Sequence, residues 1–309
     1  MTGVAPLGPA GGIDRADALR QDDVLLAEAW ARADTRVLLV GDGAVGLAGA
    51  GAGRAAEAPA ALALVRPEQA PDGERLFLGI GSDGAAYWAV ALAEGPPPAP
   101  HGTLRSTAAG LGERDTALLL QATTLANWHA RHAHCPRCGA RTTAERGGHA
   151  RRCPVDGSVH FPRVDPVVIM VVTDGADRCV LGRQATWPAR RYSCLAGFVD
   201  PGETVEEAVA RETGEEVGLA VGDVRYVSSQ PWPFPSNLMI GCTAIATGRL
   251  DGAAGDDVVV DGRELDDARW VTRDELRAAI AADGDPDAPL LLPPRAAIAR
   301  RLLVAWAGA

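Results

Sequence analysis

Three glutamates near the middle of the chain, Glu212, Glu215 and Glu216, have the residue type and spacing of a metal site. A Pro-Gly turn signal at 201–202 and the run that follows it predict a helix over 204–217. Positions i, i+3 and i+4 share one helix face, so the three carboxylates lie within a single turn. Hard divalent ions such as Mg²⁺ bind carboxylate oxygens together with phosphate oxygens. The spacing therefore indicates metal-assisted phosphate chemistry, and a solvated charged face is the alternative.

The residues around these glutamates form a longer pattern, G-x5-E-x7-R-E-U-x-E-E-x-G-U. Its fixed positions are Gly197, Glu203, Arg211, Glu212, Glu215, Glu216, Gly218 and Leu219. This pattern resembles the signature box of the Nudix hydrolases. Thr213 stands where that family usually has an aliphatic residue, and Gly214 follows inside the helix, where glycine costs up to about 1 kcal/mol relative to alanine. We expect a softer helix with an intact ligand set. Arg211 is interpreted as structural, because it can pair with Glu203 or Glu215.

The resemblance implies hydrolysis of a nucleoside diphosphate linked to another moiety, with Mg²⁺ or Mn²⁺ as the catalytic metal. Bound metals neutralise the pyrophosphate, lower the pKa of a bound water and steady the leaving oxygen. Glu212 and Glu216 are the expected primary ligands. Glu215 is a further ligand or the base that orients the water. The family likeness adds the backbone carbonyl of Ala196 as another ligand.

A proline-rich segment, SQPWPFPSNLM at 229–239, follows the box. Its prolines exclude a helix or a strand interior and hold Trp232 and Phe234 in a rigid frame. Such aromatics can stack a flat ring, and Gln230 can bond a base edge or ribose. A structural loop whose aromatics cap the core is the alternative. The array resembles the SQPWPFPxS tag of the NADH pyrophosphatase branch of the Nudix family, with Asn237 in place of the last serine.

A third constellation contains cysteines at metal-binding spacing. Cys135 and Cys138 form a CxxC, and Cys153 follows after fourteen residues. This spacing suggests a tetrahedral, structural Zn²⁺ site in a small ribbon. Where the resembled branch has the second cysteine of another CxxC, this chain has Asp156, and His160 stands four residues on. Both residue types ligate zinc, so either is a candidate fourth ligand. A ribbon without metal and a redox CxxC are the alternatives.

Four further site residues enter through the resemblance. Glu264, six residues before Trp270, matches a glutamate that joins the metal site. Phe161 matches an aromatic that reaches the nicotinamide site, often that of the neighbouring subunit; packing of the ribbon onto the hydrolase sheet is its alternative role. Ala299 matches a position whose backbone contacts substrate. Phe198 is expected to form, with the 230–234 loop, the walls around the two flat rings.

The 309 residues have room for two domains with separate cores. The predicted fold class is α+β, a Nudix α/β/α sandwich with a mixed sheet, preceded by a zinc ribbon and by an N-terminal Nudix-like α/β domain without a catalytic box. The predicted bounds are 1–130 for the N-terminal domain, 131–163 for the ribbon and 164–309 for the catalytic domain.

Several elements of these domains can be predicted from the residue pattern. Residues 113–132 predict a helix, 167–172 a buried strand and 295–306 a closing amphipathic helix. GDGAVG at 41–46 is not interpreted as a dinucleotide fingerprint, because no helix pattern follows it. The alanine–glycine tract after it predicts a surface loop.

The formal net charge of −10 argues against a general nucleic-acid-binding surface. The arginine pairs at 151–152, 190–191 and 300–301 can offset a phosphorylated substrate or can be solvated surface. No apolar run reaches transmembrane length, and residues 1–17 lack the features of a signal peptide. Because Cys179, Cys194 and Cys242 read as free thiols, we predict a cytoplasmic protein.

The residues indicate metal-assisted phosphate chemistry, and the resemblance implies a metal-dependent dinucleotide pyrophosphatase. With the resemblance, its substrates are NADH and NAD⁺, cleaved to nicotinamide mononucleotide and AMP, and also NAD-capped RNA, and its state is a homodimer. A Nudix hydrolase of ADP-ribose or dinucleoside polyphosphates is the alternative within the enzyme class, which the SQPWPFP array argues against. A non-catalytic module that binds nucleotides or RNA is the alternative outside it, which the intact box glutamates argue against.

Overall fold

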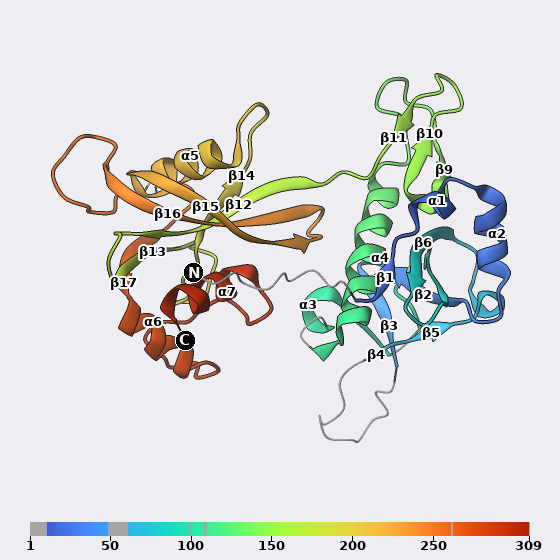
Figure 1. The fold of residues 1–309 in the computed structure, drawn as a ribbon, viewed down its shortest axis with the longest axis horizontal. Coiled ribbons are helices and arrows are strands. Elements are labelled where there is room, and N and C mark those ends of the chain that lie inside the picture. The colour runs from blue at the N-terminus through green and yellow to red at the C-terminus, as the bar shows by residue number, and fades with distance from the viewer. Residues whose placement is uncertain (1–10, 49–60, 99, 108–109, 261, 309) are drawn as a thin grey trace. The chain divides into compact units, whose positions relative to one another are not determined.

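A computed structural model describes residues 11–48, 61–98, 100–107, 110–260 and 262–308 (Figure 1). The chain divides into two compact bodies. The first comprises the described residues of 8–164 with Trp232–Ser236, and the second those of 165–231 and 237–309. Most of the alanine–glycine tract, predicted as a surface loop, and the residues assessed for a signal peptide up to position 10 lie outside the described residues.

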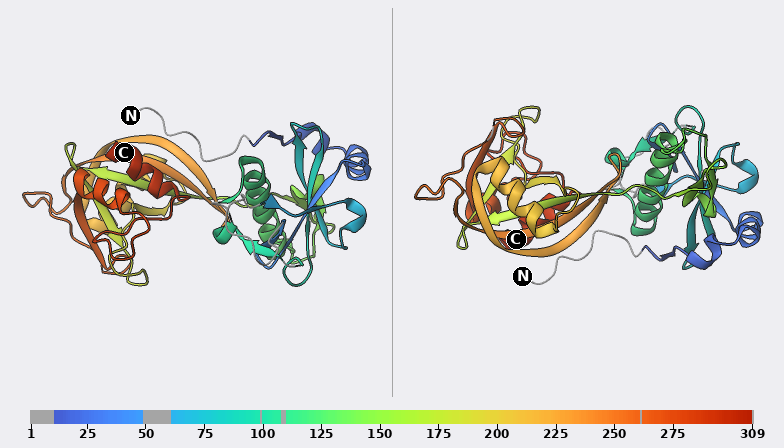
Figure 2. Two further views of the ribbon diagram at one scale, coloured as in Figure 1. Left: turned by 90° about the horizontal axis from the view of Figure 1, so that it is seen from below. Right: turned by 90° about the horizontal axis from the view of Figure 1, so that it is seen from above.

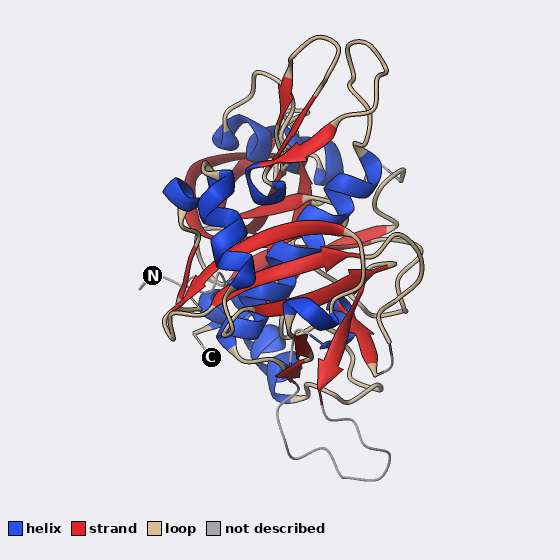
Figure 3. Ribbon diagram, turned by 90° about the vertical axis from the view of Figure 1, so that its right-hand side faces the viewer, coloured by secondary structure: helices blue, strands red, loops and turns tan. Residues whose placement is uncertain are grey.

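The first body is built on a mixed sheet, seen face-on to the viewer in Figure 3. Its elements before the ribbon are β1 (Ile13–Asp14), α1 (Asp17–Arg20), α2 (Asp23–Ala31), β2 (Arg36–Gly41), β3 (Ala44–Ala48), β4 (Ala61–Leu62), β5 (Leu64–Val65), a 3-10 turn (Pro67–Gln69), β6 (Glu74–Gly81), β7 (Ala86–Ala91), β8 (His101–Thr103), α3 (Leu104–Thr107) and α4 (Glu113–Arg131). The strand order is β1-β6-β7-β2-β3-β4, with β5 beside β2 and β8 beside β3. Strands β2 and β7 are parallel.

Both faces of this sheet are covered, because the strands are apolar at successive positions. Leu38 and Val40 of β2 face the cluster that contains the buried residues of α4, whereas Val37 and Leu39 face the cluster that contains those of α2. Helix α4 has the extent that the sequence predicts, to within one residue.

The GDGAVG segment is a hairpin turn and not the start of a helix. It joins the antiparallel strands β2 and β3. Asp42 and Gly43 both have positive φ, 50° and 71°, as a two-residue type I′ turn requires. The interpretation against a dinucleotide fingerprint is therefore confirmed.

The ribbon lies in the first body. Its strands are β9 (Thr143–Glu145), β10 (Ala150–Arg152) and β11 (Val159–His160), and their order in the sheet is β11-β10-β9. A 3-10 turn (Arg146–Gly148) joins β9 to β10. The ribbon and the N-terminal sheet thus form one compact unit, and the predicted division of this part of the chain at residue 130 stays a prediction.

A buried arginine joins the ribbon to the sheet. Arg151, 5% exposed, donates to the Thr142 hydroxyl and carbonyl, both at 2.7 Å. It also donates to Nδ1 of His129 at 2.5 Å and to Glu74 at 3.4 Å. Burial lowers the pKa of His129, so the neutral imidazole can accept this bond. Arg151 is therefore internal, which corrects both roles suggested for it by the sequence, whereas Arg152 is exposed and pairs with Glu145.

The second body is built on a sheet in the order β15-β16-β12-β13-β17, with β14 paired to β12. Its elements are β12 (Asp165–Thr173), β13 (Arg178–Arg183), β14 (Leu195–Phe198), α5 (Val205–Val217), β15 (Leu219–Trp232), β16 (Asn237–Arg249), β17 (Asp267–Thr272), α6 (Arg273–Ala281) and α7 (Ile298–Ala307). Strands β12 and β16 are parallel. β12 contains the predicted buried strand.

Helices cover both faces of this sheet. Val168 and Met170 of β12 pack in the cluster of α5, whereas Ile169 and Val171 pack in the cluster of α6 and α7. The two views in Figure 2 show α6 and α7 over one face and α5 over the other. The predicted α/β/α sandwich with a mixed sheet is therefore confirmed.

Helix α7 begins three residues later than predicted. The amide of Ala297 donates to the carbonyl of Pro294 at 2.9 Å, so a turn occupies the residues that the apolar pattern assigned to the first helical turn. Within the described part of the chain, no helix combines the length and apolar character needed to cross a membrane.

The two neighbouring arginines of β10 give a matched test of the first body. Replacing Arg151 with Gln should lower the free energy of unfolding by about 2 kcal/mol or more, because several buried bonds to a charged donor are lost. Arg152→Gln removes only a surface pair and should cost less than about 1 kcal/mol. Urea unfolding followed by circular dichroism measures both, and equal losses would show that the Arg151 network contributes nothing special.

Candidate functional site

The helix that carries the glutamates is fixed at both ends by local bonds. Thr204 is the N-cap of α5: its hydroxyl accepts from the Glu207 amide at 3.2 Å, and the Glu207 carboxylate accepts from the Thr204 amide at 2.7 Å. Gly218 ends the helix in the left-handed conformation, with φ 71°. These signals place the carboxylate face at a defined position on the sheet.

Arg211 organises the carboxylates. Its guanidinium makes two bonds to Glu203, at 2.6 and 2.9 Å. It also donates to Glu212 at 2.8 Å, to Glu215 at 2.9 Å and to the carbonyl of Phe198 at 2.8 Å. These bonds with Arg211 hold the pKa of Glu203 down, at about 2. The sequence suggested Glu203 or Glu215 as the partner, and the structure shows both.

Strand β14 approaches the Glu212 carboxylate closely because it has a glycine there. A Cβ on Gly197 would stand 1.8 Å from Cδ of Glu212. Gly197 lies opposite Val168 in the sheet, and Ala196 precedes it opposite Ile169. The predicted carbonyl ligand Ala196 is thus on the strand against which the carboxylate lies.

The four predicted acidic ligands differ in exposure. Glu212 and Glu216 are buried, at 7% and 5% exposure, whereas Glu215 and Glu264 are exposed. Burial raises the pKa of Glu212, and the charges of Glu215 and Glu264 raise it further against the opposing effect of Arg211. Glu264 therefore lies near enough to Glu212 to influence its ionisation, although it is 52 positions away in the sequence.

This donor set fits a hard divalent cation. It consists of carboxylate oxygens, two of them on buried residues, beside a strand that a glycine lets approach closely. Such oxygen ligands suit Mg²⁺ or Mn²⁺, and a bound cation would favour the ionised form of Glu212, which burial and the neighbouring carboxylates disfavour.

Thr213 and Gly214, the two positions that depart from the box or weaken its helix, are both accommodated by the packing around α5. Thr213 is fully buried, and its hydroxyl donates to the carbonyl of Val209 at 2.7 Å, so no polar group is left unpaired. A Cβ on Gly214 would stand 2.5 Å from a methyl carbon of Leu250. The helix is continuous across both residues, and its expected softness stays a prediction.

Gln230 bonds within the protein. Its amide nitrogen donates to the carbonyl of Ala296 at 2.8 Å, and its amide oxygen accepts from the amide of Ile298 at 2.7 Å. The side chain therefore ties the end of β15 to the start of α7, where the buried Ala299 lies. The sequence placed Gln230 against a base or ribose, and in this structure its amide holds the first turn of α7 instead.

The aromatics of the array pack against each other. The rings of Trp232 and Phe234 meet edge to face, with centroids 5.2 Å apart. Phe234 also packs against the apolar cluster around α4, and Asn127 of that helix donates to the carbonyl of Pro233 at 3.4 Å. The sequence left open that the aromatics of this segment cap a core, and Phe234 does so in the structure.

The two remaining aromatic candidates are exposed. Phe161 is 61% exposed, and the guanidinium of Arg146 lies 5.8 Å from its ring centroid. Phe198, at the end of β14, is 54% exposed. Both rings are thus accessible for the ligand contacts that the resemblance implies, which stay predictions.

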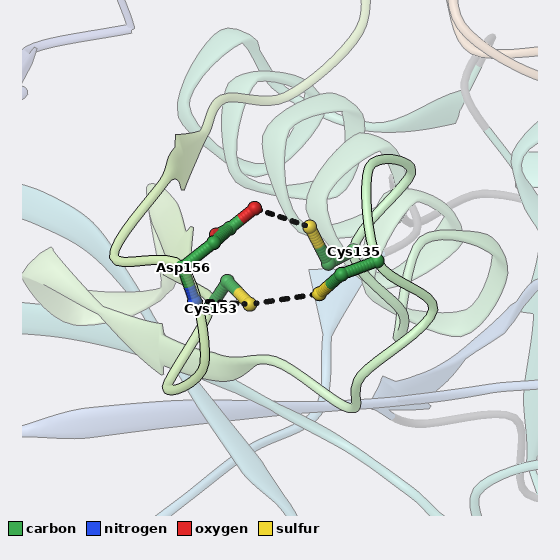
Figure 4. A group of neighbouring side chains, drawn as sticks. Cys135, Cys153 and Asp156 are labelled. Atoms are coloured by element: carbon green, nitrogen blue, oxygen red, sulfur yellow. Dashed lines mark hydrogen bonds between the residues drawn. The ribbon is translucent and has the colours of Figure 1, made fainter.

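Four side chains of the ribbon form a cluster that could hold a metal ion. Figure 4 labels three of them, Cys135, Cys153 and Asp156. The candidate ligand atoms of Cys135, Cys138, Cys153 and Asp156 all lie within 4.8 Å of one another. The sulfurs of Cys138 and Cys153 are 3.5 Å apart, and that of Cys135 is 3.7 Å from the Asp156 carboxylate. Three thiolates and a carboxylate fit tetrahedral zinc.

His160 is outside this cluster, one hydrogen bond away. Its Nε2 lies 3.0 Å from the Ser158 hydroxyl, which in turn donates to Asp156 at 2.5 Å. The sequence left Asp156 and His160 open as the fourth ligand, and the structure brings Asp156 to the sulfurs. Ser158, which the sequence reasoning missed, links the two. Its signal was the short D-G-S turn, in which Asp156 accepts from the Ser158 amide at 2.9 Å.

The ribbon also prepares one thiol for metal binding. Although burial opposes ionisation, hydrogen bonds from Ser158 and from the amides of Arg137 and Cys138 bring the pKa of Cys135 down to about 6. Zinc binds the thiolate form, so this environment favours the ligating state.

The cluster predicts about one zinc per chain. Asp156→Ala should lower zinc retention during dialysis against a chelator and lower the melting temperature, since it removes a ligand. His160→Ala removes only an outer hydrogen bond and should have the smaller effect on both. Elemental analysis and thermal scans measure these outcomes. A larger loss of zinc from His160→Ala than from Asp156→Ala would assign the fourth ligand to His160. If protein prepared without chelators contains no zinc, the predicted zinc site is wrong.

Comparisons with known proteins agree with this geometry. The family model described as NUDIX domain matches residues 163–292, and that described as NADH pyrophosphatase zinc ribbon domain matches residues 130–161. Relatives named NAD-capped RNA hydrolase NudC, from Mycobacterium bovis and Mycobacterium tuberculosis, are 40% identical over 317 residues, which cover 98% of this chain and 95% of theirs. The human protein named NAD-capped RNA hydrolase NUDT12 is 43% identical over 205 residues, covering 63% of this chain and 42% of its own. The chain therefore belongs to the Nudix hydrolase family, in the branch of the NADH pyrophosphatases and NAD-capped RNA hydrolases.

Proposed function

We propose that this protein hydrolyses the pyrophosphate bond of NADH and NAD⁺, yielding the nicotinamide mononucleotide and AMP, and removes NAD caps from RNA to leave a 5′-monophosphate. The observation that carries the proposal is the group of carboxylates around Glu212: Arg211 bonds both Glu212 and Glu215, and the charges of Glu215 and Glu264 act on Glu212. Glu216 follows Glu212 by four positions on the same helix. The names of the full-length relatives supply the substrate class.

The buried and the exposed carboxylates of the site would have different roles. Glu212 and Glu216 would hold Mg²⁺ or Mn²⁺ from the buried side, with the Ala196 carbonyl, and Glu215 and Glu264 would complete the site from the exposed side. A bound cation neutralises pyrophosphate charge and makes a water molecule more acidic. Arg211 fixes the orientation of Glu212 and Glu215, so both carboxylates are in place before substrate binds.

The ribbon zinc would be structural, with Asp156 as the fourth ligand, because the cluster lies among bonds that shape the ribbon. Ring contacts from Phe161, Phe198 and Trp232, a backbone contact from Ala299, a homodimeric state and a cytoplasmic location complete the proposal. For Gln230 we propose an indirect part, through its bonds to the first turn of α7.

Product analysis with NADH, NAD⁺, ADP-ribose and NAD-capped RNA, in Mg²⁺ and in Mn²⁺, tests the function directly. We expect mononucleotide products from NADH and a lower rate on ADP-ribose. Cleavage of ADP-ribose at the higher rate would instead favour the alternative hydrolase, and binding without products would favour the non-catalytic module.

Glu216→Gln should lower turnover by about 10²–10⁴-fold, since loss of a metal-held charge costs several kcal/mol of barrier. Glu206→Gln, an exposed position on the same helix outside the cluster, is the matched control and should keep its rate. Steady-state kinetics with NADH measures both, and circular dichroism checks the fold. Retention of more than about a tenth of the rate in Glu216→Gln would take this residue out of the mechanism.

Trp232→Ala should reduce kcat/KM for NADH more than for ADP-ribose, which lacks the nicotinamide ring. Lost stacking of about 0.5–1.5 kcal/mol corresponds to roughly a 2–12-fold difference between the substrates. Phe234→Ala is the comparison, because Phe234 packs on an apolar cluster and its loss should lower the melting temperature. Equal losses on both substrates would place Trp232 away from the nicotinamide, and no loss would leave the array a structural turn.

A further inference from the structure

The ribbon segment has a charge opposite to that of the whole chain. Residues 131–163 contain seven arginines and two carboxylate side chains, whereas the chain has a formal net charge of −10. The segment stays net positive when three thiolates and one Zn²⁺ are added to this balance. A basic segment of this kind in an acidic protein calls for a partner or a structural role.

Two of the seven arginines have a structural role. Arg151 is buried in the junction with the sheet, and Arg152 makes two bonds to Glu145, at 2.7 and 3.1 Å. Neither is available to a ligand without breaking the bonds that hold the ribbon together.

Three others lie before, within and after the CxxC of Cys135 and Cys138, a turn that we call the knuckle. We name Arg131, Arg137 and Arg141 the knuckle arginines. Arg131 is the last residue of α4, Arg137 lies between the two cysteines of the CxxC, and Arg141 pairs with His134 in a β-bridge across the knuckle. All three are exposed. In the part of the chain that the structure describes, no carboxylate pairs with Arg131 or Arg141, and Arg137 is 3.8 Å from Asp156.

The backbone under these side chains is rigid. The amide of Cys135 donates to the carbonyl of Ala140 at 2.8 Å, that of Gly139 to Cys135 at 2.9 Å, and that of Thr142 to Ala133 at 2.9 Å. Because these anchor points are already ordered, a ligand would have to order only the arginine side chains and not the backbone that carries them.

We propose that the knuckle arginines bind phosphates of the RNA chain that follows an NAD cap. This inference rests on the proposed function and extends it to substrate choice. A free dinucleotide carries only the two phosphates of the bond that is cleaved, whereas capped RNA adds further phosphates that need cationic partners. Guanidinium groups match phosphate oxygens in paired hydrogen bonds, and an otherwise acidic protein repels RNA elsewhere.

The test compares two substrates in one variant, Arg131→Gln with Arg141→Gln. For a short NAD-capped single-stranded RNA at low salt, kcat/KM should fall about 3–10-fold, and its log–log dependence on salt should become shallower by about 1.4, the value for two lost phosphate contacts. The value for NADH should not change. Arg66→Gln with Arg225→Gln is the matched control, since these arginines are exposed, at 63% and 73% of the side chain, outside the ribbon.

Equal falls on both substrates, or no fall on RNA, would overturn the proposal. Binding of uncapped 5′-monophosphate RNA, measured by fluorescence anisotropy, gives a second reading that does not need catalysis. If the unmodified protein fails to cleave NADH, the proposed function fails, and the anisotropy comparison still decides whether this surface binds RNA. If the double variant loses zinc, Arg131→Gln alone repeats both measurements, because Arg131 lies on α4.

Discussion

Arg211 holds the carboxylate face of α5 to the loop and strand before it, because its donors reach Glu203, Glu212, Glu215 and the carbonyl of Phe198 together. One guanidinium cannot neutralise all the carboxylates near it. Burial raises the pKa of Glu212, and the charges of Glu215 and Glu264 raise it further against the opposing effect of Arg211. The same interaction that assembles the site therefore leaves it with an affinity for cations.

The sheet supplies the precision that this arrangement needs. β12 is buried on both faces, so α5 packs on one side and α6 with α7 on the other, and neither side can shift alone. β14 is paired to the same strand over four residues, which places Gly197 under the Glu212 carboxylate. Gln230 then connects β15 to the first turn of α7. Helices α5, α6 and α7 and strand β14, which are far apart in the sequence, are in this way positioned by the single strand β12.

The parts predicted well from the sequence are those set by local rules. The extents of α4 and α5 and the burial of β12 follow from spacing, turn signals and apolar runs. The late start of α7 was missed, because a turn after two prolines has the same apolar spacing as a helix. The box pattern also singled out Glu212 and Glu215, both of which Arg211 bonds.

What the sequence could not provide depends on distant partners. Arg151 and Arg152 are chemically equal in the sequence, and bonds to Thr142, to His129 and to Glu74, 77 positions away, distinguish the buried one. Asp156 and His160 are both zinc-ligand types, and the short turn at Ser158 decides which side chain reaches the sulfurs. The SQPWPFP array was interpreted from its chemistry, whereas the role of each side chain in it depends on what the fold brings beside it.

Among the described residues, the ribbon and the α5 face offer two sets of ligand types that suit different metals. The ribbon offers three sulfurs and one oxygen, with the pKa of Cys135 lowered to about 6, a set that favours a borderline-soft ion such as zinc. The α5 face offers carboxylate oxygens without a thiol among the described residues that form it, a set that favours hard ions with exchangeable water. A metal that must stay bound and a metal that must exchange with substrate oxygens need different ligands. Because ligand type alone separates them, the structural site need not compete with the proposed catalytic site for the same ion.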